Sequence, residues 1–429
     1  MWALGAYVTV ITGIWAVHGG MSSFGDGPSG VATGVTQLTG LYASAAGLVG
    51  LLLTARPRFI ERRYGLDRLF NWHRVLGEAM AILVGVHVVT AVIAWQVNGE
   101  WASAIADLTG REPYFAGATI GAVLIGIVTV TSLRSIRNRL SYETWYFLHL
   151  TAYLAFGLSF GHMIVAGTDF SNDAAARWTW IGLHVAVALA LLVGRWGRLV
   201  VSVLRPLRVA EIRRISPDVY TVRLSGRRLH SLRGASGQFC FLRPLTRDGW
   251  WHSNPFSLSA APTVDGLRFS IKDRGDASSH LLALPIGTRV AVDGPYGVCT
   301  PERFDGRKVL FVVGGVGIAP ARALLEDLPP RSQPIVLYRA HSEADLLHYD
   351  ELVELTGRRG GRVMTLVGPS ASLAVRDPFS AASLRRAVPD VTERVAVLCG
   401  PDRLLQAARK GLTTVGVDRS DIHFEHAWW

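Results

Sequence analysis

Long apolar runs fill the first half of the chain, and short alternating segments fill the second half. The apolar runs predict six membrane-spanning helices, because each is near the ~20 residues that cross the hydrocarbon of a bilayer. Since no basic residues precede the first run, we expect a retained helix and not a signal peptide. The six expected spans are 2–20, 35–55, 74–97, 114–133, 144–166 and 178–200.

Downstream of residue 205, the pattern predicts two further domains. Alternating residues broken by Gly and Pro predict a small antiparallel β-barrel, with strands at 207–215, 219–226, 237–244, 255–260, 266–273 and 288–293. Strands then alternate with helices, which predicts a doubly wound parallel sheet. Its expected strands are Lys308–Val313, Pro334–Arg339, Arg362–Val367, Arg394–Leu398 and Asp421–Phe424. We therefore expect a multidomain membrane protein with an all-α six-helix bundle at 1–204, the barrel at 205–302 and the α/β domain at 303–429.

Composition supports a membrane protein. Charged residues make up 18% of the 429 residues and hydrophobic residues 49%, whereas a soluble protein usually carries about 25% charged residues. This excludes a disordered chain and argues against a purely soluble one. The three cysteines are too few and too scattered for a disulfide framework or an iron–sulfur cluster.

The net charge of +11 is carried almost wholly by arginine, and the arginines are unevenly distributed. They gather after the second, fourth and sixth spans, whereas the other connections hold mainly acidic residues. The positive-inside rule therefore predicts that both termini are cytoplasmic, and contact with anionic lipid accounts for much of the charge. No nucleic-acid-binding motif stands out. The arginines of the three basic segments are Arg56, Arg58, Arg62, Arg63, Arg68 and Arg74; Arg134, Arg137 and Arg139; and Arg195, Arg198, Arg205 and Arg208.

Histidines provide the first chemical argument. The third span carries His73 and His87, and the fifth carries His149 and His162. At a rise of 1.5 Å per residue, the members of each pair are about 20 Å apart along their helix. Two helices with matched pairs could hold two stacked haems, each bound by one imidazole from each helix. The alternative is that these histidines serve helix packing or the membrane interface.

The intervals between the histidines differ. Fourteen residues return to nearly the same helix face, whereas thirteen miss it by about 140°. Either the fifth span is overwound or bent, near Gly157 and Gly161, or its histidines meet their haems from different azimuths. His18 and His184 are expected at the level of the outer pair, either as interfacial residues or in contact with the outer haem or its acceptor.

Three motifs in the barrel indicate a flavin. The segment Asn254-Pro255-Phe256-Ser257 places an aromatic ring next to a hydroxyl on a strand, where the two could stack on and hydrogen-bond a flavin. Gly275 begins a Gly-x-x-Ser turn with Ser278 and Ser279, whose backbone N–H groups could face a pyrophosphate. The third motif is Gly294-Pro295-Tyr296-Gly297.

The α/β domain begins with a strand that leads into a glycine-rich turn and a helix. Gly314, Gly315, Gly317 and Pro320 belong to this turn, and the context predicts a phosphate-binding loop. At the end of the next strand, Arg339 favours a ribose 2′-phosphate and therefore NADPH over NADH; the alternative is a solvated arginine.

A third group of residues closes the fourth strand of the α/β domain. Cys399, Gly400 and Pro401 follow one another there. Cys399 is either a buried structural thiol or a residue beside the nicotinamide.

Together these residues make the chain resemble the ferric reductase / NADPH oxidase superfamily. The resemblance implies a cytochrome b domain fused to a ferredoxin–NADP⁺ reductase-like module. It also implies that His73 and His149 hold the inner haem and that His87 and His162 hold the outer one. In relatives of the reductase module, a glutamate near the C-terminus precedes an aromatic that covers the flavin. The glutamate position corresponds to Glu425, and the aromatic, with a shifted register, is Trp429 or its neighbour Trp428.

The chain departs from the family pattern at several positions. Asn254 stands where a histidine or arginine is usual, so His252 could supply the phosphate contact. Oxygen-reducing members carry a second histidine one turn beyond the outer ligand of the third span, where this chain has Ala91. They also use an arginine within the second span, and here none precedes Arg56.

The resemblance implies that electrons pass from cytoplasmic NADPH or NADH through FAD and two b-type haems to an acceptor outside a multi-pass plasma membrane. The expected acceptor is a ferric chelate. The alternatives are superoxide production from O₂ and a relay subunit for a periplasmic protein, although the sequence identifies no protein partner. Within this scheme we expect Cys399 and Glu425 to be the catalytic residues.

Overall fold

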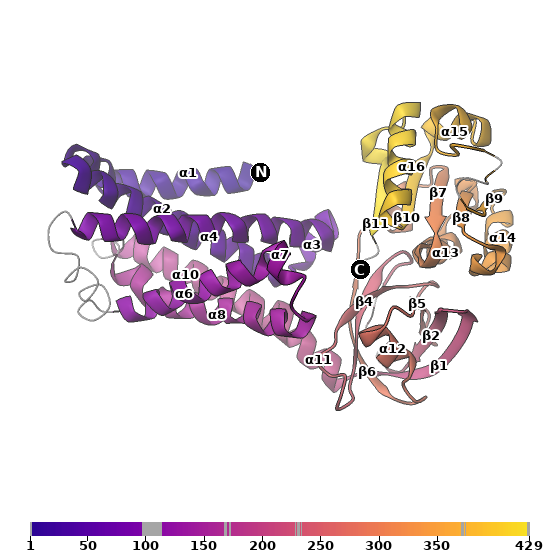
Figure 1. The fold of residues 1–429 in the computed structure, drawn as a ribbon, viewed down its shortest axis with the longest axis horizontal. Coiled ribbons are helices and arrows are strands. Elements are labelled where there is room, and N and C mark those ends of the chain that lie inside the picture. The colour runs from indigo at the N-terminus through magenta and orange to yellow at the C-terminus, as the bar shows by residue number, and fades with distance from the viewer. Residues whose placement is uncertain are drawn as a thin grey trace. The chain divides into compact units, whose positions relative to one another are not determined.

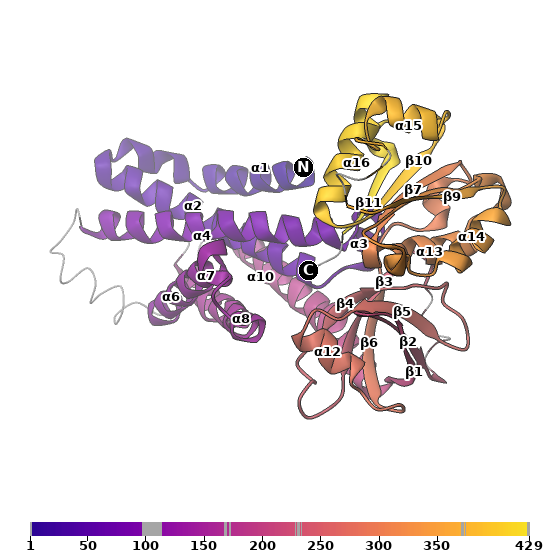
Figure 2. The same ribbon diagram turned by 45° about the vertical axis from the view of Figure 1, so that its right-hand side comes forward.

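The structure is a computed structural model that describes residues 2–96, 114–166, 170, 173–227, 229, 232, 234–369, 373 and 375–426. The chain divides into two compact units (Figures 1 and 2). The first contains the residues up to Pro57 together with Asp67–Trp196. The second contains Arg58–Leu66 together with the chain from Gly197 onward.

The first unit is helical. Five of the described helical segments are long and apolar enough to cross a membrane: Gly27–Thr54, Leu66–Ala94, Phe115–Ser132, Tyr142–Val165 and Ala174–Leu204. The last of these includes a π-helical turn and continues into the second unit. The elements are α1 (Trp2–Val17), η1 (Gly20–Gly25), α2 (Gly27–Thr54), α4 (Leu66–Gln96), α6 (Phe115–Ser132), α7 (Arg134–Arg137), α8 (Tyr142–Val165), α10 (Ala174–Leu191), η2 (Leu192–Gly197) and α11 (Arg198–Leu204).

The spans expected second to sixth are thus confirmed as helices of sufficient length and apolarity, but the first is not. Helix α1 has 16 residues, and at 1.5 Å per residue it is about 24 Å long, which is less than the ~30 Å hydrocarbon thickness. The expectation of six full spans is therefore confirmed only in part, since the described residues show five such helices and one shorter apolar helix.

Small residues let the helices that carry the histidines pack closely. A Cβ atom added to Gly121 of α6 would lie 2.9 Å from the carbonyl oxygen of Ala155 in α8, so the two backbones are in direct contact. A Cβ atom on Gly47 of α2 would lie 2.5 Å from the Phe156 ring of α8. Glycines at these positions therefore hold α8 between α6 and α2.

An antiparallel sheet begins the main part of the second unit, with strand order β4-β3-β6-β1-β2-β5. Its two edge strands, β4 and β5, meet in the described residues at one isolated bridge, Leu258 with Phe269. No ladder joins β4 to β5 in the described residues, so the expected closed barrel is an open sheet. The strands are β1 (Leu207–Ser216), β2 (Val219–Ser225), β3 (Phe239–Pro244), β4 (Asn254–Ser257), β5 (Leu267–Lys272) and β6 (Arg289–Tyr296).

The predicted parallel sheet is confirmed, with strand order β11-β10-β7-β8-β9. Helices cover both of its faces (Figure 1). Alternate residues of its buried strands pack into two separate cores, one on each face. Phe311 and Val336 face α13, whereas Leu310 and Leu337 face α15 and α16. The elements are β7 (Val309–Gly314), α13 (Ile318–Asp327), β8 (Ile335–Ala340), α14 (Tyr349–Gly357), β9 (Arg362–Val367), α15 (Ala381–Ala387), β10 (Val395–Gly400), α16 (Asp402–Val415) and β11 (Ile422–His426).

Short helices complete the second unit. Helix α3 belongs to it, although in sequence it lies between the membrane helices α2 and α4. Helix α12 follows β5, and 3-10 turns link the other elements. Their bounds are α3 (Arg58–Tyr64), α12 (Asp276–Leu282), η4 (Pro301–Phe304), η5 (Gly315–Gly317), η6 (Pro330–Ser332), η7 (Glu343–Asp345), η9 (Val391–Glu393) and η10 (Arg419–Asp421).

Candidate functional site

The four span histidines meet in two pairs within the helical unit. His73 of α4 faces His149 of α8, with ring centroids 6.0 Å apart. His87 of α4 faces His162 of α8, with ring centroids 6.1 Å apart. The structure thus brings the predicted residues together, one imidazole from each helix at each of two levels.

Helix α2 orients the two histidines of α4. The Nδ1 atom of His73 lies 3.1 Å from the carbonyl oxygen of Gly50, and that of His87 lies 2.8 Å from the carbonyl oxygen of Thr36. Because a carbonyl can only accept, each Nδ1 carries the hydrogen and donates it. In the neutral ring the lone pair is then on Nε2, the nitrogen available to a metal.

The two histidines of α8 are held differently. The Nδ1 atoms of His149 and His162 are buried and have no hydrogen-bond partner in the described part of the chain. Aromatic rings pack against both imidazoles instead. Trp145 stacks on His149 at 5.0 Å, and Phe115 lies edge-on to His162 at 4.5 Å.

The thirteen-residue interval is accommodated without a break in the helix. Helix α8 is α-helical throughout Tyr142–Val165, with no 3-10 or π turn. Both of its histidines nevertheless reach their partners, with interplanar angles of 78° and 67°. Of the two sequence alternatives, this favours histidines that approach from different azimuths.

Two imidazoles per level suit haem and not a bare metal ion. Among the described residues, no group of three or more His, Cys, Asp or Glu side chains could hold a metal ion. Imidazoles that share one metal ion through bonds of about 2 Å have centroids roughly 6 Å apart, which is the separation of both pairs. The pairs therefore fit a porphyrin iron, whose macrocycle supplies the remaining ligands.

The other two outer histidines take separate places. His18 Nε2 lies 3.1 Å from a carboxylate oxygen of Asp173. His184 packs among Phe156, Phe160 and Trp180. The nearest of these rings is that of Phe160, with centroids 4.9 Å apart, and Phe160 precedes His162 by two residues in α8.

The flavin motif lies on β4, whose partner is β3. Phe256 is 4% exposed and belongs to the core of the antiparallel sheet, so its ring packs inside the protein. Pro255 and Ser257 alternate onto the opposite, half-buried face, and Asn254 begins the strand. The residues available to a ligand are therefore Asn254, Pro255 and Ser257.

The predicted pyrophosphate turn precedes α12. Gly275 has a φ of 88°, and a Cβ atom there would meet no atom within 4 Å, so the space beside it is open. Ser278 donates its hydroxyl hydrogen to the carbonyl of Gly275, and Ser279 donates to Asp273. The two hydroxyls brace the turn, and the Ser279 bond holds the pKa of Asp273 below its usual range.

The glycine-rich turn of the parallel sheet contacts the end of β10. A Cβ atom on Gly317 would lie 2.5 Å from the carbonyl oxygen of Cys399, and one on Gly400 would lie 3.1 Å from that of Gly314. Gly315, with a φ of 56°, faces open space. The turn therefore packs tightly on one side and leaves its backbone free toward a phosphate on the other. Pro320 is buried in the first turn of α13, and Pro401 precedes α16.

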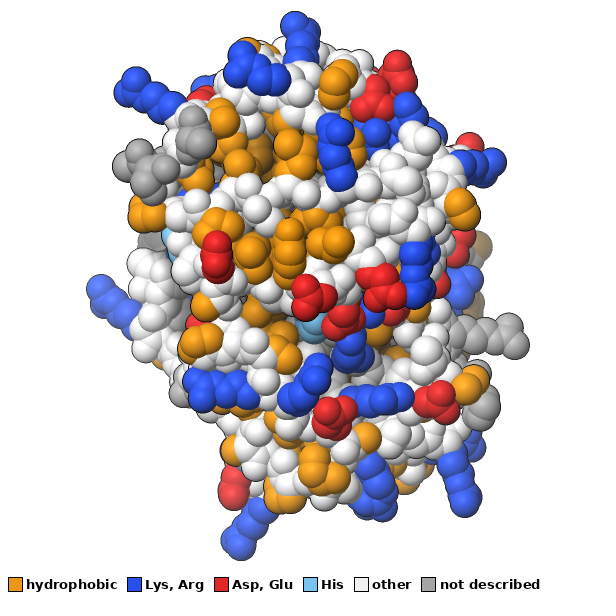
Figure 3. All heavy atoms as spheres, turned by 90° about the vertical axis from the view of Figure 1, so that its right-hand side faces the viewer, with side chains coloured by type: hydrophobic (Ala, Val, Ile, Leu, Met, Phe, Trp, Pro, Cys, Tyr) orange, Lys and Arg blue, Asp and Glu red, His pale blue; other side chains and the backbone are white. Residues whose placement is uncertain are grey.

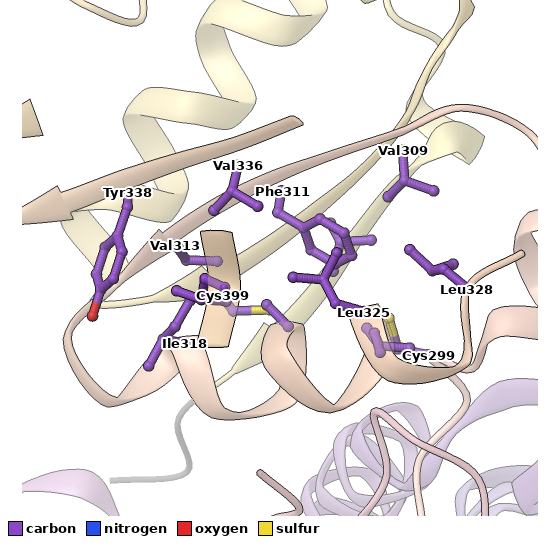
Figure 4. Packing of buried hydrophobic residues seen from close by; sticks show 14 of the residues in the cluster. Cys299, Val309, Phe311, Val313, Ile318, Leu325, Leu328, Val336, Tyr338 and Cys399 are labelled. Carbon is purple, nitrogen blue, oxygen red and sulfur yellow. The ribbon is translucent and has the colours of Figure 1, made fainter. Parts of the chain in front are cut away.

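Cys399 and Glu425 are register partners on the parallel strands β10 and β11. The Cys399 thiol is fully buried among core residues around α13 (Figure 4). Burial raises its pKa, and the nearby Glu425 carboxylate raises it further. The thiol therefore stays protonated near neutral pH. Trp429, the expected flavin cover, lies outside the described residues.

Arg339 ends the predicted strand but is already engaged. Its guanidinium donates to the carbonyl oxygens of Leu366 at 2.9 Å and Gly368 at 2.6 Å, and also to that of Ala340. The side chain thus ties β8 to the end of β9. A 2′-phosphate at this position would have to share the guanidinium with these carbonyls.

Sequence reasoning missed the part of α2 that faces the histidines. A Cβ atom on Gly40 would lie 2.9 Å from His87 Nδ1, and one on Gly50 would lie 3.6 Å from His73 Nδ1. Backbone carbonyls leave no trace in a sequence. The glycines Gly40 and Gly47, one heptad apart, were the signal that this helix face approaches a neighbour closely.

Comparison with known proteins gives two family matches. Residues 39–160 match the ferric reductase like transmembrane component, and residues 206–300 match an FAD-binding domain. The first match covers His73, His87 and His149 and ends two residues before His162, and the second covers the antiparallel sheet.

Three curated relatives illustrate the similarity. The reductase component of propane 2-monooxygenase from Rhodococcus jostii (strain RHA1) is 27% identical, over 51% of this chain and 62% of its own. The heavy chain of a superoxide-generating NADPH oxidase from Dictyostelium discoideum is 25% identical, over 57% and 47%. A probable ferric reductase transmembrane component of Candida albicans is 23% identical, over 76% and 48%. The chain thus spans between 47% and 62% of the length of these relatives.

Proposed function

Because the chain joins a ferric reductase-like transmembrane component to an FAD-binding domain, we propose that it is a membrane oxidoreductase. In this proposal electrons pass from cytoplasmic NAD(P)H through FAD and two b-type haems to an acceptor outside, which is a ferric chelate. The observation that carries the proposal is the meeting of four histidines in two pairs, each with the ring separation of two ligands to one iron.

When bound, FAD takes a hydride from NAD(P)H and releases single electrons, and each haem iron carries one electron at a time. His73 and His149 would hold the inner haem, and His87 and His162 the outer one. The α2 carbonyls keep the lone pairs of His73 and His87 on Nε2. The protein part of the electron path is thus built from α2, α4 and α8.

On the donor side, the backbone prepares two sites for phosphate. The open faces of Gly275 and Gly315 suit the pyrophosphates of FAD and NAD(P)H respectively. Cys399 and Glu425 lie side by side next to the Gly314–Gly317 turn, so this strand end would border the nicotinamide. Because the Cys399 thiol is fully buried in the core around α13, it would support the site from behind and would not touch the ring.

The arrangement in the membrane follows from charge. The arginine-rich segments follow the second, fourth and sixth predicted spans, which supports cytoplasmic termini in a plasma membrane. NAD(P)H is a cytoplasmic reductant, so this orientation supports electron flow outward.

Two features favour a ferric chelate over oxygen. Ala91 stands one turn beyond His87, where oxygen-reducing members of the superfamily carry a histidine, and α2 contains no arginine. Superoxide production remains the second candidate because of the similarity to the Dictyostelium oxidase heavy chain. A third candidate is delivery of electrons to a separate periplasmic protein.

The test uses membranes that contain the full chain, supplied with haem and FAD. Oxidation of NADPH coupled to reduction of a ferric chelate without oxygen would support the proposal. Reduction of a dye that superoxide dismutase abolishes would favour the oxidase, and activity only with an added protein would favour the relay. A haem content below two per chain, measured from the oxidised-minus-reduced absorbance spectrum, would contradict the proposed electron path.

A further inference from the structure

Within the second unit, a cluster of charged side chains joins the antiparallel sheet to the parallel-sheet domain. Arg268 of β5 belongs to the antiparallel sheet, whereas Arg322 and Glu326 of α13 and Glu351 of α14 belong to the parallel-sheet domain. We name these four residues the clamp. Figure 3 shows acidic and basic side chains gathered with a histidine across the middle of one face of the molecule.

Arg322 is the centre of the clamp. It is 6% exposed, which is unusual for an arginine and requires that its charge be compensated. Its guanidinium lies 2.5 Å from carboxylate oxygens of both Glu326 and Glu351. It also donates to the carbonyl oxygen of Ser259 at 3.0 Å. Arg322 thus holds backbone of the antiparallel sheet from the other domain.

The same backbone segment is held at two further points. Arg268 donates to the Ser259 carbonyl at 2.9 Å and to Glu351 at 3.0 Å. The backbone N–H of Ala261 donates to Glu326. Two arginines and two glutamates therefore balance in charge around residues 259–261.

His348 extends the clamp from the start of α14. Its Nδ1 lies 3.1 Å from Glu351, and its Nε2 lies 2.9 Å from the hydroxyl of Ser270 on β5. The three partners of Glu351 hold the pKa of its carboxyl well below the usual range, with the His348 bond first. Glu351 is therefore ionised at all physiological pH values and receives hydrogen bonds from both domains.

The clamp contacts segments that directly follow both cofactor motifs in the sequence. Ser259 follows the flavin motif Asn254–Ser257 by two residues, and Arg322 lies one helical turn after the Gly315–Gly317 turn has led into α13. We propose that the clamp sets the distance between the flavin and nicotinamide sites, and that Arg322 and Glu351 are positioning residues for hydride transfer. This inference rests on the proposed function.

Hydride transfer is sensitive to such positioning. One C–H bond of the nicotinamide breaks, and its hydrogen leaves with both electrons and forms an N–H bond on the flavin ring, which oxidises NADPH to NADP⁺ and reduces the flavin. A displacement of 1 Å between donor and acceptor can cost about 100-fold in rate. Loss of Glu351 leaves the two guanidinium groups of Arg268 and Arg322 with one carboxylate, that of Glu326, and the two domains would then shift relative to each other.

The experiment compares Glu351→Gln with Glu354→Gln in the full-length protein. Glu354 lies on the same helix and pairs with Arg358 at the surface, 60% exposed, so it is a matched control. Flavin reduction by saturating NADPH is followed anaerobically by stopped flow. We expect Glu351→Gln to lower the limiting rate at least 10-fold and to increase the deuterium isotope effect. NADP⁺ affinity, FAD content and reduction by dithionite should stay unchanged, and Glu354→Gln should match the wild type.

A second variant and a second measurement guard against misfolding. Arg322→Lys keeps the charge but cannot bridge both glutamates and Ser259, so it should also slow the limiting rate. Hydrogen exchange at residues 259–261 should accelerate in both variants, and this readout does not depend on NADPH. If either folded variant shows both the wild-type limiting rate of flavin reduction and wild-type hydrogen exchange at residues 259–261, the proposed role of the clamp is wrong. A wild-type protein that no nicotinamide reduces would contradict the proposed function, while the exchange result would still judge the clamp.

Discussion

The Nδ1 atom of His87 lies 2.8 Å from the carbonyl oxygen of Thr36, so a backbone group of α2 orients a histidine of α4. A Cβ atom on Gly40, one turn further along α2, would lie 2.9 Å from the same nitrogen. Helix α2 therefore both binds the imidazole and limits the room around it, although it contributes no ligand.

The first prediction concerns this contact. Gly40→Ala should displace the His87 ring and lower the affinity of the protein for the outer haem. Losing the partner that orients a metal ligand costs roughly 10–100-fold in affinity. Haem quantitation per polypeptide, together with the low-temperature difference spectrum, measures the effect.

Gly50→Ala is the matched control for Gly40→Ala. Its Cβ atom would lie 3.6 Å from His73 Nδ1, which is ordinary van der Waals contact. Both haems should remain in this variant. Equal loss in the two variants would show that the glycines serve helix packing in general.

The second prediction separates the two levels. His87→Leu removes one ligand of the outer pair and should lower the haem content from two to one per chain, because the pair would retain only His162. The pair of His73 and His149 should keep its spectrum, and flavin reduction by NADPH should remain at the wild-type rate. Retention of two haems would contradict the assignment of His87 as a ligand.

The third prediction tests the two roles of Arg339. If the guanidinium binds a 2′-phosphate, Arg339→Ala should raise the KM for NADPH at least tenfold more than the KM for NADH. If it serves only the carbonyls of Leu366 and Gly368, both values should change alike and the melting temperature should fall. Steady-state kinetics with both nucleotides, paired with thermal unfolding, distinguishes these outcomes.

The fourth prediction follows from the buried thiols. Burial raises the pKa of Cys299 and of Cys399, so both should remain protonated and unreactive at pH 9, whereas an unfolded cysteine ionises near about 8.5. Because the folded protein holds the thiol protons more tightly than the unfolded chain, protonated thiols favour the folded state. This contribution to the free energy of unfolding is fully present below the pKa of the unfolded cysteines and is lost as the pH rises through the pKa of the folded ones. Labelling with a thiol reagent at pH 9 should be slow in the native protein.

The denatured chain is the reference for that measurement. All three cysteines are buried in the folded protein, so all three should react quickly after denaturation. Fast labelling of Cys399 in the native protein would show that the strand end opens more readily than its burial indicates.

The elements that depend on periodic or local sequence patterns were predicted correctly. Apolar runs identified α2, α4, α6, α8 and the helix that starts at Ala174, because a span must be apolar along its whole length. Turn residues identified the Gly314–Gly317 loop, because a strand, a glycine turn and a helix are adjacent in the chain. Two expectations differ in extent: among the described residues α1 is shorter than the five long apolar helices, and the antiparallel sheet is open, with one isolated bridge next to its edges.

Contacts between elements that are far apart in the sequence could not be predicted from sequence patterns. The intervals between the histidines predicted two levels, but the rotation of α8 about its axis determined how His162 reaches His87 despite the thirteen-residue interval. Phe256 looked like a flavin platform and is instead core, because its face of β4 is covered by the sheet's own side chains.

Local chemistry along the chain was therefore enough to identify the spans, the turns and the four imidazoles. The carbonyls of Thr36 and Gly50 and the clamp around Arg322 came from the folded arrangement alone. The physical reason is that a backbone acceptor is identical at every residue, and a buried charge is tolerated only where packing delivers its partners. Neither the choice of backbone acceptor nor the partners of a buried charge can be determined before the helices and sheets are packed together.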